Sequence, residues 1–103
     1  MVVTGYVKDR ILYLNLSGEM DECSSREARA RCDRLIDENV SVKKIVINLS
    51  EVAFMDSTGI GFLIGRYKKA NKLSLPLYVE NPTFAADKIL NLSGIYTLIP
   101  KAK

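Results

Sequence analysis

The sequence predicts an α/β fold whose mixed, mostly parallel sheet opens with an antiparallel hairpin. Two strand-like stretches flank the short polar turn Lys8-Asp9-Arg10, which suits a tight antiparallel connection. Further along, apolar stretches typical of strands alternate with stretches of helical periodicity, which implies right-handed crossovers between parallel strands. Ile45-Val46-Ile47 and Leu49 form a nearly continuous, largely β-branched apolar run, as expected of a strand buried on both faces. The length of 103 residues suits one domain, which we expect to span residues 1–103.

A capping pattern marks the first helix. Ser24 and Glu27 form a Ser-x-x-Glu capping box, so we expect the helix to begin near Ser25. The apolar positions that follow recur at helical spacing and predict a buried stripe of Ala28, Cys32, Leu35 and Ile36. On the other face, Arg29 and Asp33 lie four residues apart, which suits an ion pair within the helix.

The second helix is expected from about Ser57 to Asn71, after the central strand. Its apolar positions predict an inward face of Ile60, Leu63, Ile64 and Tyr67. We expect Phe54 in the core and Arg66 at the surface. A glycine in a helix interior costs up to about 1 kcal/mol relative to alanine. We therefore expect the backbone to approach the sheet or a partner closely at Gly59, Gly61 and Gly65.

The last third of the chain is expected to add a strand, a helix and a final strand. Apolar residues over 75–79 predict the first of these. Asn81 as N-cap, with Pro82 at the first helical position, predicts the start of the helix. Gly94 predicts its end. Residues 95–99 predict the final strand.

Composition narrows the functional classes. The net charge of +3 is small, and acidic residues stand among the arginines of 26–34, so we interpret this stretch as a solvated helix face and expect no direct binding of nucleic acid. No apolar run approaches the ~20 residues of a membrane span. Met1-Val2-Val3 enters a strand pattern directly, without a secretory signal. Cys23 and Cys32 lie about 13 Å apart along a helix, beyond disulfide reach, which suits a reduced, cytoplasmic protein.

Catalysis and cofactor binding have little support in the sequence. The chain has no histidine, which excludes a Ser-His-Asp triad. It also lacks a Gly-x-x-x-x-Gly-Lys-Ser/Thr phosphate-binding loop. Carboxylates that could serve as metal ligands follow no spacing that suggests a site: Glu19, Asp21, Glu51 and Asp56. We therefore expect no enzyme activity, no cofactor and no metal.

The junction between the central strand and the second helix is the most informative part of the chain. Asp56, Ser57 and Thr58 place side-chain oxygens where a helix presents unpaired N–H groups. A phosphate on Ser57 would be favoured there by the helix dipole; ordinary capping by an unmodified Ser57 is the alternative. Ligands of such sheets gather beyond the carboxyl ends of strands. We therefore expect this loop and the acidic turn Glu19–Asp21 to form one composite surface.

The same stretch closely resembles a family signature. Phe54-Met55-Asp56-Ser57-Thr58-Gly59-Ile60-Gly61, followed by Gly65-Arg66-Tyr67-Lys68, is similar to the signature of the STAS family (sulfate transporter and anti-sigma factor antagonist). Leu16-Ser17-Gly18-Glu19-Met20-Asp21 resembles the family's Gly-Glu-Leu-Asp turn. Asn81-Pro82 and Leu92-Ser93-Gly94-Ile95 resemble its third helix and final strand. The similarity covers nearly the whole chain in order and so implies the STAS fold.

The resemblance implies an anti-sigma factor antagonist. In that role the unphosphorylated protein binds an anti-sigma factor, itself a serine kinase, and so frees a sigma factor. The kinase phosphorylates Ser57, with Thr58 as the rival acceptor, and a partner phosphatase restores the hydroxyl. The implied partner-binding residues are Glu19, Asp21, Asp56, Ser57, Thr58, Gly59 and Ile60. We expect a monomer or a weak dimer.

Two other functions stay open. Family members tend to end in an amphipathic helix, whereas this chain stops at Pro100-Lys101-Ala102-Lys103, so we expect that helix to be missing. The sheet face left uncovered favours a non-switching STAS module in a transporter-linked or stress-sensing assembly. The third possibility is direct binding or hydrolysis of a nucleotide, for which Gly59-x-Gly61 alone is a weak signal.

Overall fold

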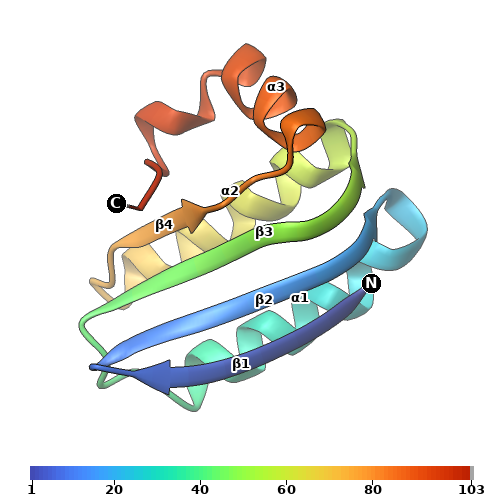
Figure 1. The fold of residues 1–103 in the computed structure, drawn as a ribbon. Helices are drawn as coiled ribbons and strands as arrows, with labels where there is room; N and C mark the ends of the chain where they lie inside the picture. Colours follow the sequence, from blue (N-terminus) through green and yellow to red (C-terminus); the bar gives the residue numbers. More distant parts are fainter. Residues whose placement is uncertain (103) are drawn as a thin grey trace.

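The computed structural model describes residues 1–102 and has the predicted sheet. The strand order is β1-β2-β3-β4. β1 (Val2–Lys8) pairs antiparallel with β2 (Ile11–Met20), whereas β2 with β3 (Lys44–Met55) and β3 with β4 (Leu77–Glu80) are parallel pairs. The α/β class and the opening hairpin are therefore confirmed (Figure 1).

The hairpin turn consists of only two residues. Asp9 and Arg10 have φ angles of 53° and 63°. Left-handed backbone at both central positions is typical of type I′ turns, whose twist matches that of the flanking strands. Aspartate is among the residues that adopt this conformation with least strain. The turn aligns Tyr6 with Tyr13 across the two strands.

Two long helices lie side by side on one face of the sheet. α1 (Glu22–Asp37) follows β2, and α2 (Ser57–Lys72) follows β3 (Figure 1). Both helices start at the edge of the sheet where the parallel strands end. The core lies between them and the sheet, and its fully buried side chains include Leu12, Leu14, Leu16, Met20, Ile36, Ile45, Ile47, Leu49 and Leu63. Among residues 1–102, no helix has the length and apolar character needed to cross a membrane.

The first helix begins earlier than predicted. Its N-cap is Asp21, whose carboxylate accepts the backbone N–H of Ser24 at 3.0 Å. Ser24 therefore lies inside the first turn and is not the cap. The buried stripe is confirmed, since Ala28, Cys32, Leu35 and Ile36 are all buried. Burial raises the pKa of the Cys32 thiol to about 12, whereas Cys23 is exposed, and both thiols are free.

The predictions for the second helix were only partly right. Leu63 is fully buried, and Ile60, Ile64 and Tyr67 are partly buried against the core. Arg66, however, is only 6% exposed, and Phe54 is 48% exposed, so both predictions were wrong. The physical reason is that α2 packs against α1 as well as against the sheet, which buries a wider arc. At Phe54 the neighbouring Met55 takes the inward position instead.

The last third of the chain departs furthest from the predictions. α3 (Phe84–Ser93) is capped by Thr83, not Asn81. Asn81 has a φ of 50°, which is incompatible with the extended backbone of an N-cap. Gly94 ends the helix as predicted, with a φ of 75°.

The predicted final strand is replaced by a 3₁₀ turn, η1 (Ile95–Thr97). The Ile99 N–H donates to the Ile95 carbonyl at 2.9 Å, and both side chains are buried. The apolar spacing here is therefore that of a helical turn and not of a strand. Among the described residues after η1, Lys101 alone joins the sheet, through an isolated parallel bridge to Val79.

Candidate functional site

The site is built from two adjacent strand ends. In the parallel pairing of β2 with β3, Met20 is aligned with Met55, the last residue of each strand. An aspartate follows each methionine and caps the next helix: Asp21 for α1 and Asp56 for α2. The acidic turn and the Asp56–Thr58 loop thus lie next to each other at one edge of the sheet (Figure 1).

Asp21 is held by one neighbour. Its Oδ1 accepts the Ser24 N–H at 3.0 Å and lies 2.9 Å from Ser24 Oγ. Ser24 Oγ is also 2.8 Å from the Glu19 carbonyl oxygen, which fixes the turn onto the helix. Hydrogen bonds from the Ser24 backbone N–H, and then from its hydroxyl, lower the pKa of Asp21. The carboxylate is therefore charged and oriented by the first turn of α1.

Asp56 caps α2 more simply. Its Oδ1 accepts the Thr58 N–H at 2.8 Å, and its carbonyl oxygen accepts the Gly59 N–H at 2.9 Å. Ser57 occupies the first helical position and is exposed. Within residues 1–102 its side chain makes no hydrogen bond. Asp56 therefore caps the helix, and the Ser57 hydroxyl is accessible for reaction.

Gly59 fixes the start of α2 against the two strand ends. A Cβ at this position would lie 2.5 Å from Met55 Cγ and 2.8 Å from Met20 Sδ, too close for any side chain without movement. The predicted close approach is correct here. At Gly61 and Gly65 a Cβ would meet open space, so the backbone does not approach the sheet closely there.

The predicted partner-binding residues are gathered at this edge with different exposures. Glu19 and Ser57 are exposed, Asp21, Asp56 and Thr58 are half-buried, and Gly59 is buried. Ile60 packs partly against the core. The exposed side chains are thus a carboxylate and a hydroxyl, flanked by the two capping carboxylates.

Two exposed aromatic residues lie near the site, although Phe54 was expected in the core and Phe84 was not considered. Phe84, the first residue of α3, is 88% exposed, and Phe54 is 48% exposed. The Thr83 hydroxyl lies 3.1 Å from the Val52 carbonyl oxygen, which fastens the start of α3 to β3 two residues before Phe54. Placing the N-cap at Thr83 would have identified Phe84 as the first residue of α3, directly beside the cap.

A polar groove of about 500 Å³ separates the first halves of α1 and α2. Its lining residues are Glu22, Ser25, Arg26, Arg29, Thr58, Gly61 and Phe62. The expected pair of Arg29 with Asp33 is not formed, because Asp33 Oδ1 lies 2.9 Å from Arg66 Nε instead. Burial lowers the pKa of Arg66, and the charge of Asp33 opposes this effect. This ion pair and that of Lys69 with Asp37 at 2.9 Å link the second halves of the two helices.

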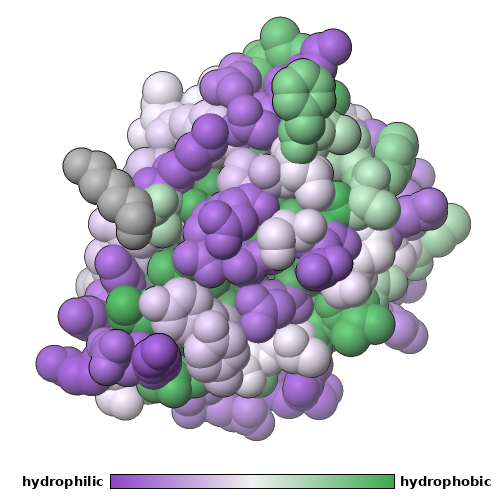
Figure 2. Space-filling view, viewed as in Figure 1, coloured by the Kyte–Doolittle hydropathy of each residue, from purple (hydrophilic) through white to green (hydrophobic). Residues whose placement is uncertain are grey.

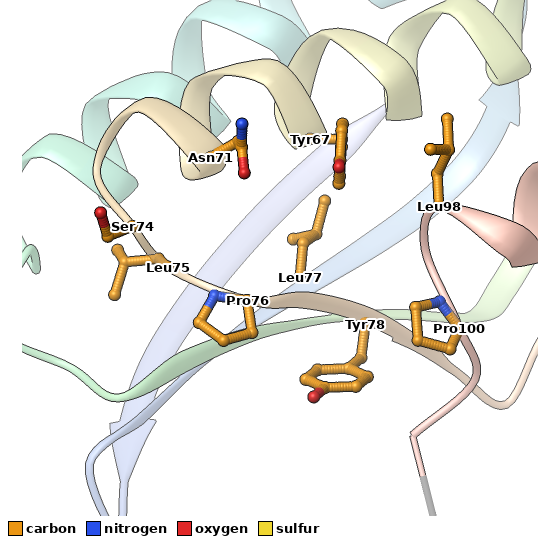
Figure 3. A pocket seen from close by; sticks show the side chains of 9 residues that line it. All are labelled: Tyr67, Asn71, Ser74, Leu75, Pro76, Leu77, Tyr78, Leu98 and Pro100. Carbon is orange, nitrogen blue, oxygen red and sulfur yellow. The ribbon is translucent and has the colours of Figure 1, made fainter.

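A second hollow of similar size lies at the other end of α2. It is lined by Tyr67, Asn71, Ser74, Leu75, Pro76, Leu77, Tyr78, Leu98 and Pro100 (Figure 3). These residues come from the end of α2, the loop that follows it, the start of β4 and the segment after η1, far from Ser57. The described residues contain no group of three or more His, Cys, Asp or Glu side chains placed to hold a metal ion.

Comparisons with solved structures agree with this architecture. An anti-sigma factor antagonist from Mycobacterium paratuberculosis gives a TM-score of 0.85 at 23% identity over 97% of this chain and 83% of that one. The anti-sigma factor antagonist SpoIIAA gives 0.78 in its unphosphorylated form, at 24% identity over 99% of this chain and 89% of that one. SpoIIAA of Bacillus in its phosphorylated form gives 0.70, also at 24% identity, over 99% of this chain and 92% of that one.

Sequence comparisons point the same way. The chain is 32% identical over 90 residues to the anti-sigma F factor antagonist of Paenibacillus polymyxa, which covers 87% of this chain and 76% of that protein. The model of the STAS domain family matches residues 3–102. With that match and the shared fold, the chain belongs to the STAS domain family.

Proposed function

We propose that this protein is an anti-sigma factor antagonist in which Ser57 is the phosphorylation switch. Its unphosphorylated form binds an anti-sigma factor that is a serine kinase, and so releases a sigma factor. The observation that carries the proposal is the position of Ser57, an exposed hydroxyl at the start of α2 with no hydrogen bond to residues 1–102. The anti-sigma factor antagonist names of its relatives support the same role.

The start of α2 can accept a phosphate without disturbing the fold. Asp56 already holds the Thr58 N–H, so the phosphate need not replace the cap. No acidic residue lies in the first turn of α2. A phosphate at the first helical position would therefore interact favourably with the helix dipole, while its oxygens stay in water.

The same phosphate would be unfavourable within a protein–protein interface. It adds about 1.5 to 2 negative charges beside Asp56 and the Glu19–Asp21 turn. A partner shaped to fit a small hydroxyl would meet extra volume, like charge and a desolvation penalty. Phosphorylation thus ends binding by blocking the surface, and needs no rearrangement of the fold.

Phe54 and Phe84 extend this surface with apolar area. Exposed aromatic residues are frequent anchors of protein interfaces, and Phe84 is 88% exposed. Replacing Phe84 by serine is expected to weaken kinase binding about tenfold. The free energy of unfolding should stay nearly unchanged, because the ring buries so little surface. Leu92 is 77% exposed at the far end of α3, and Leu92→Ser is the matched control.

Serine is the better acceptor of the two neighbouring hydroxyls. Thr58 is half-buried and lines the groove between α1 and α2, whereas Ser57 is exposed. A kinase transfers the γ-phosphate of ATP to the Ser57 oxygen, which loses its proton, and releases ADP. A phosphatase hydrolyses the ester and returns the protein to its binding form.

The proposal is tested with anti-sigma kinases encoded in the same genome and Mg-ATP. Intact mass and peptide mapping should show one phosphate, on Ser57, in wild type and in Thr58→Val. Ser57→Ala should bind the kinase but accept no phosphate, and Ser57→Asp should bind at least tenfold more weakly. A phosphate mapped to Thr58, or tight binding by Ser57→Asp, would contradict the switch.

A further inference from the structure

The face of the sheet opposite α1 and α2 carries no helix within residues 1–102 (Figure 1). We call it the open sheet face. Because side chains alternate along strands, every second residue points to this face. The cross-strand pairing places these residues in four rows that run across the sheet. In order along the strands, the rows are Lys8, Ile11 and Lys44; Tyr6, Tyr13, Val46 and Tyr78; Thr4, Asn15, Asn48 and Glu80; and Val2, Ser17 and Glu51.

The second row is a band of tyrosines. The rings of Tyr6 and Tyr13 are stacked, with centroids 5.0 Å apart and planes 15° from parallel. Val46 lies between Tyr13 and Tyr78 in the row and is only 2% exposed, whereas Tyr6 is 50% exposed. Tyrosine combines a large apolar ring with a hydroxyl and is enriched at protein interfaces. The band is therefore a preformed aromatic centre on a face whose other rows are mostly polar, apart from Ile11 in the first row and Val2 in the fourth.

Charge changes sign along the strands. Lys8 and Lys44 stand in the first row, and the Lys44 Nζ lies 5.2 Å from the centre of the Tyr78 ring. Glu80 and Glu51 stand in the third and fourth rows. The Glu80 carboxylate accepts Asn48 Nδ2 at 2.9 Å, so it is oriented by its neighbour. Figure 2 shows this side of the molecule as a mosaic of hydrophilic and intermediate residues with apolar areas between them.

We propose that the open sheet face binds a second copy of this chain, in a two-fold symmetric dimer with antiparallel strands. A symmetric interface brings the same patch of both subunits together. Two faces can meet with their strands parallel or antiparallel. The parallel arrangement sets lysine rows against each other. The antiparallel one sets the lysine row of each subunit against the Glu51 row of its partner, and the tyrosine band against the Asn15–Asn48 row, which also holds Glu80.

The size of the face sets the expected affinity. It offers roughly half of the 20–30 residues that each partner contributes to a standard-size interface. With a charged rim and one aromatic band, we expect association in the micromolar range, strengthened at low ionic strength. The Ser57 site lies at the end of the strands, so an antiparallel dimer places the two sites at its opposite ends. Both sites then remain accessible to kinase.

Charge reversal tests the proposal directly. Lys8→Glu/Lys44→Glu makes both ends of the face acidic, and Glu51→Lys/Glu80→Lys makes both ends basic. Sedimentation velocity at 50 mM salt should show a concentration-dependent dimer for wild type, and at least tenfold weaker association for each variant alone. An equimolar mixture of the two variants should restore the dimer, because acidic ends then meet basic ends. Both associations should weaken at 500 mM salt.

The matched control changes the same number of charges elsewhere. Lys68 and Lys88 are exposed on α2 and α3, and Lys68→Glu/Lys88→Glu should leave the wild-type dimer intact. The proposal is overturned if wild type stays monomeric to millimolar concentration, if the reversed variants dimerise as wild type does, or if their mixture does not associate. Should the reversed variants fail to fold by circular dichroism, Tyr6→Ser provides the test, since it removes the most exposed ring of the band. Kinase binding is measured in parallel and should be unchanged, so failure here is distinct from failure of the Ser57 switch.

Discussion

The starts of α1 and α2 are built on the same plan but end in different chemistry. Each follows a parallel strand, and each is capped by an aspartate. In α1 the first helical residue is the acid Glu22. The third, Ser24, donates its hydroxyl to the carboxylate of the capping Asp21. In α2 the first residue is the neutral Ser57, and the third, Gly59, has no side chain at all.

The difference separates a structural helix start from one that can change state. α1 starts with two acidic side chains of its own, Asp21 and Glu22, and the Ser24 hydroxyl bonds within the turn. α2 carries one capping charge, and its exposed hydroxyl would gain charge only by modification. Because the backbone at Gly59 packs tightly against Met20 and Met55, the position of the Ser57 hydroxyl is fixed relative to the sheet. The first turn of α1 thus has its Ser24 hydroxyl engaged, whereas the first turn of α2 keeps one exposed hydroxyl, that of Ser57. Variants can test each part of this difference.

The largest expected effect on stability comes from removing the ion pair that links α1 to α2. Asp33→Ala leaves the buried Arg66 guanidinium without its ion-pair partner. Removing one partner of a buried pair costs several kcal/mol. Since the Asp33 side chain is 35% exposed, we expect a loss of about 2–3 kcal/mol in the free energy of unfolding, measured with urea. Asp33→Ala/Arg66→Met should recover part of this loss, and a double variant as unstable as the single one would contradict the explanation.

The next effect concerns the support beneath Ser57. Gly59→Ala forces a methyl group into the space of the Met55 and Met20 side chains, and overpacking of this kind costs about 2 kcal/mol. Gly61→Ala is the matched control, because its methyl group meets open space. That variant should be neutral or more stable by up to about 1 kcal/mol. Equal destabilisation by both variants would show that the close packing at Gly59 is unimportant.

A smaller effect compares the two caps. Asp56→Ala should lower the free energy of unfolding by about 1 kcal/mol, and Asp56→Asn by much less, since asparagine is an equally good cap. Asp21→Ala should lower the thermal midpoint more than Asp56→Ala does, because two groups of Ser24 lose their acceptor. Thermal unfolding of the three variants checks the order, and the reverse order would remove the distinction between the caps.

The smallest effect is a dependence on pH. Hydrogen bonds from Ser24 hold the pKa of Asp21 below its unfolded value. The charged form of Asp21 therefore stabilises the fold above about pH 4, and this contribution is lost as the pH falls through the folded pKa. Asp21→Asn removes it. The difference in stability between wild type and Asp21→Asn should be present at pH 7 and shrink at pH 3, whereas a constant difference would argue against the charge.

The elements that were predicted correctly from the sequence are those with a local signal. The hairpin, the central strand and the start of α2 were predicted because the Asp9-Arg10 turn, the apolar run 44–49 and the oxygen-bearing Asp56 act on their nearest neighbours. The adjacency of the two loops followed from strand direction alone. These signals need no knowledge of which surfaces meet in three dimensions.

The errors arose where long-range packing or an unusual backbone decides the outcome. Arg66 is buried beside Asp33, 33 residues away in the sequence, which supplies its ion-pair partner. Asn81 is left-handed, which moves the cap of α3 to Thr83 and turns Phe84 outward. The exposure of Phe54 likewise depends on which residue of the pair 54–55 faces the core. The aromatic part of the candidate surface therefore could not be predicted from periodicity.

The pairing of β2 with β3 also limits how the chain can change length in evolution. Their register shifts between Asn15 and Ser17 and again between Gly18 and Glu19, so that Met20 and Met55 end together. An insertion or deletion in the hairpin turn or in the loop after α1 would leave this coincidence intact. A single-residue deletion between Asn48 and Met55 would offset the two aspartates and turn side chains to the opposite face. Natural length variation should therefore concentrate in the loops distant from Ser57, while both strands keep a fixed count from their irregularities to their ends.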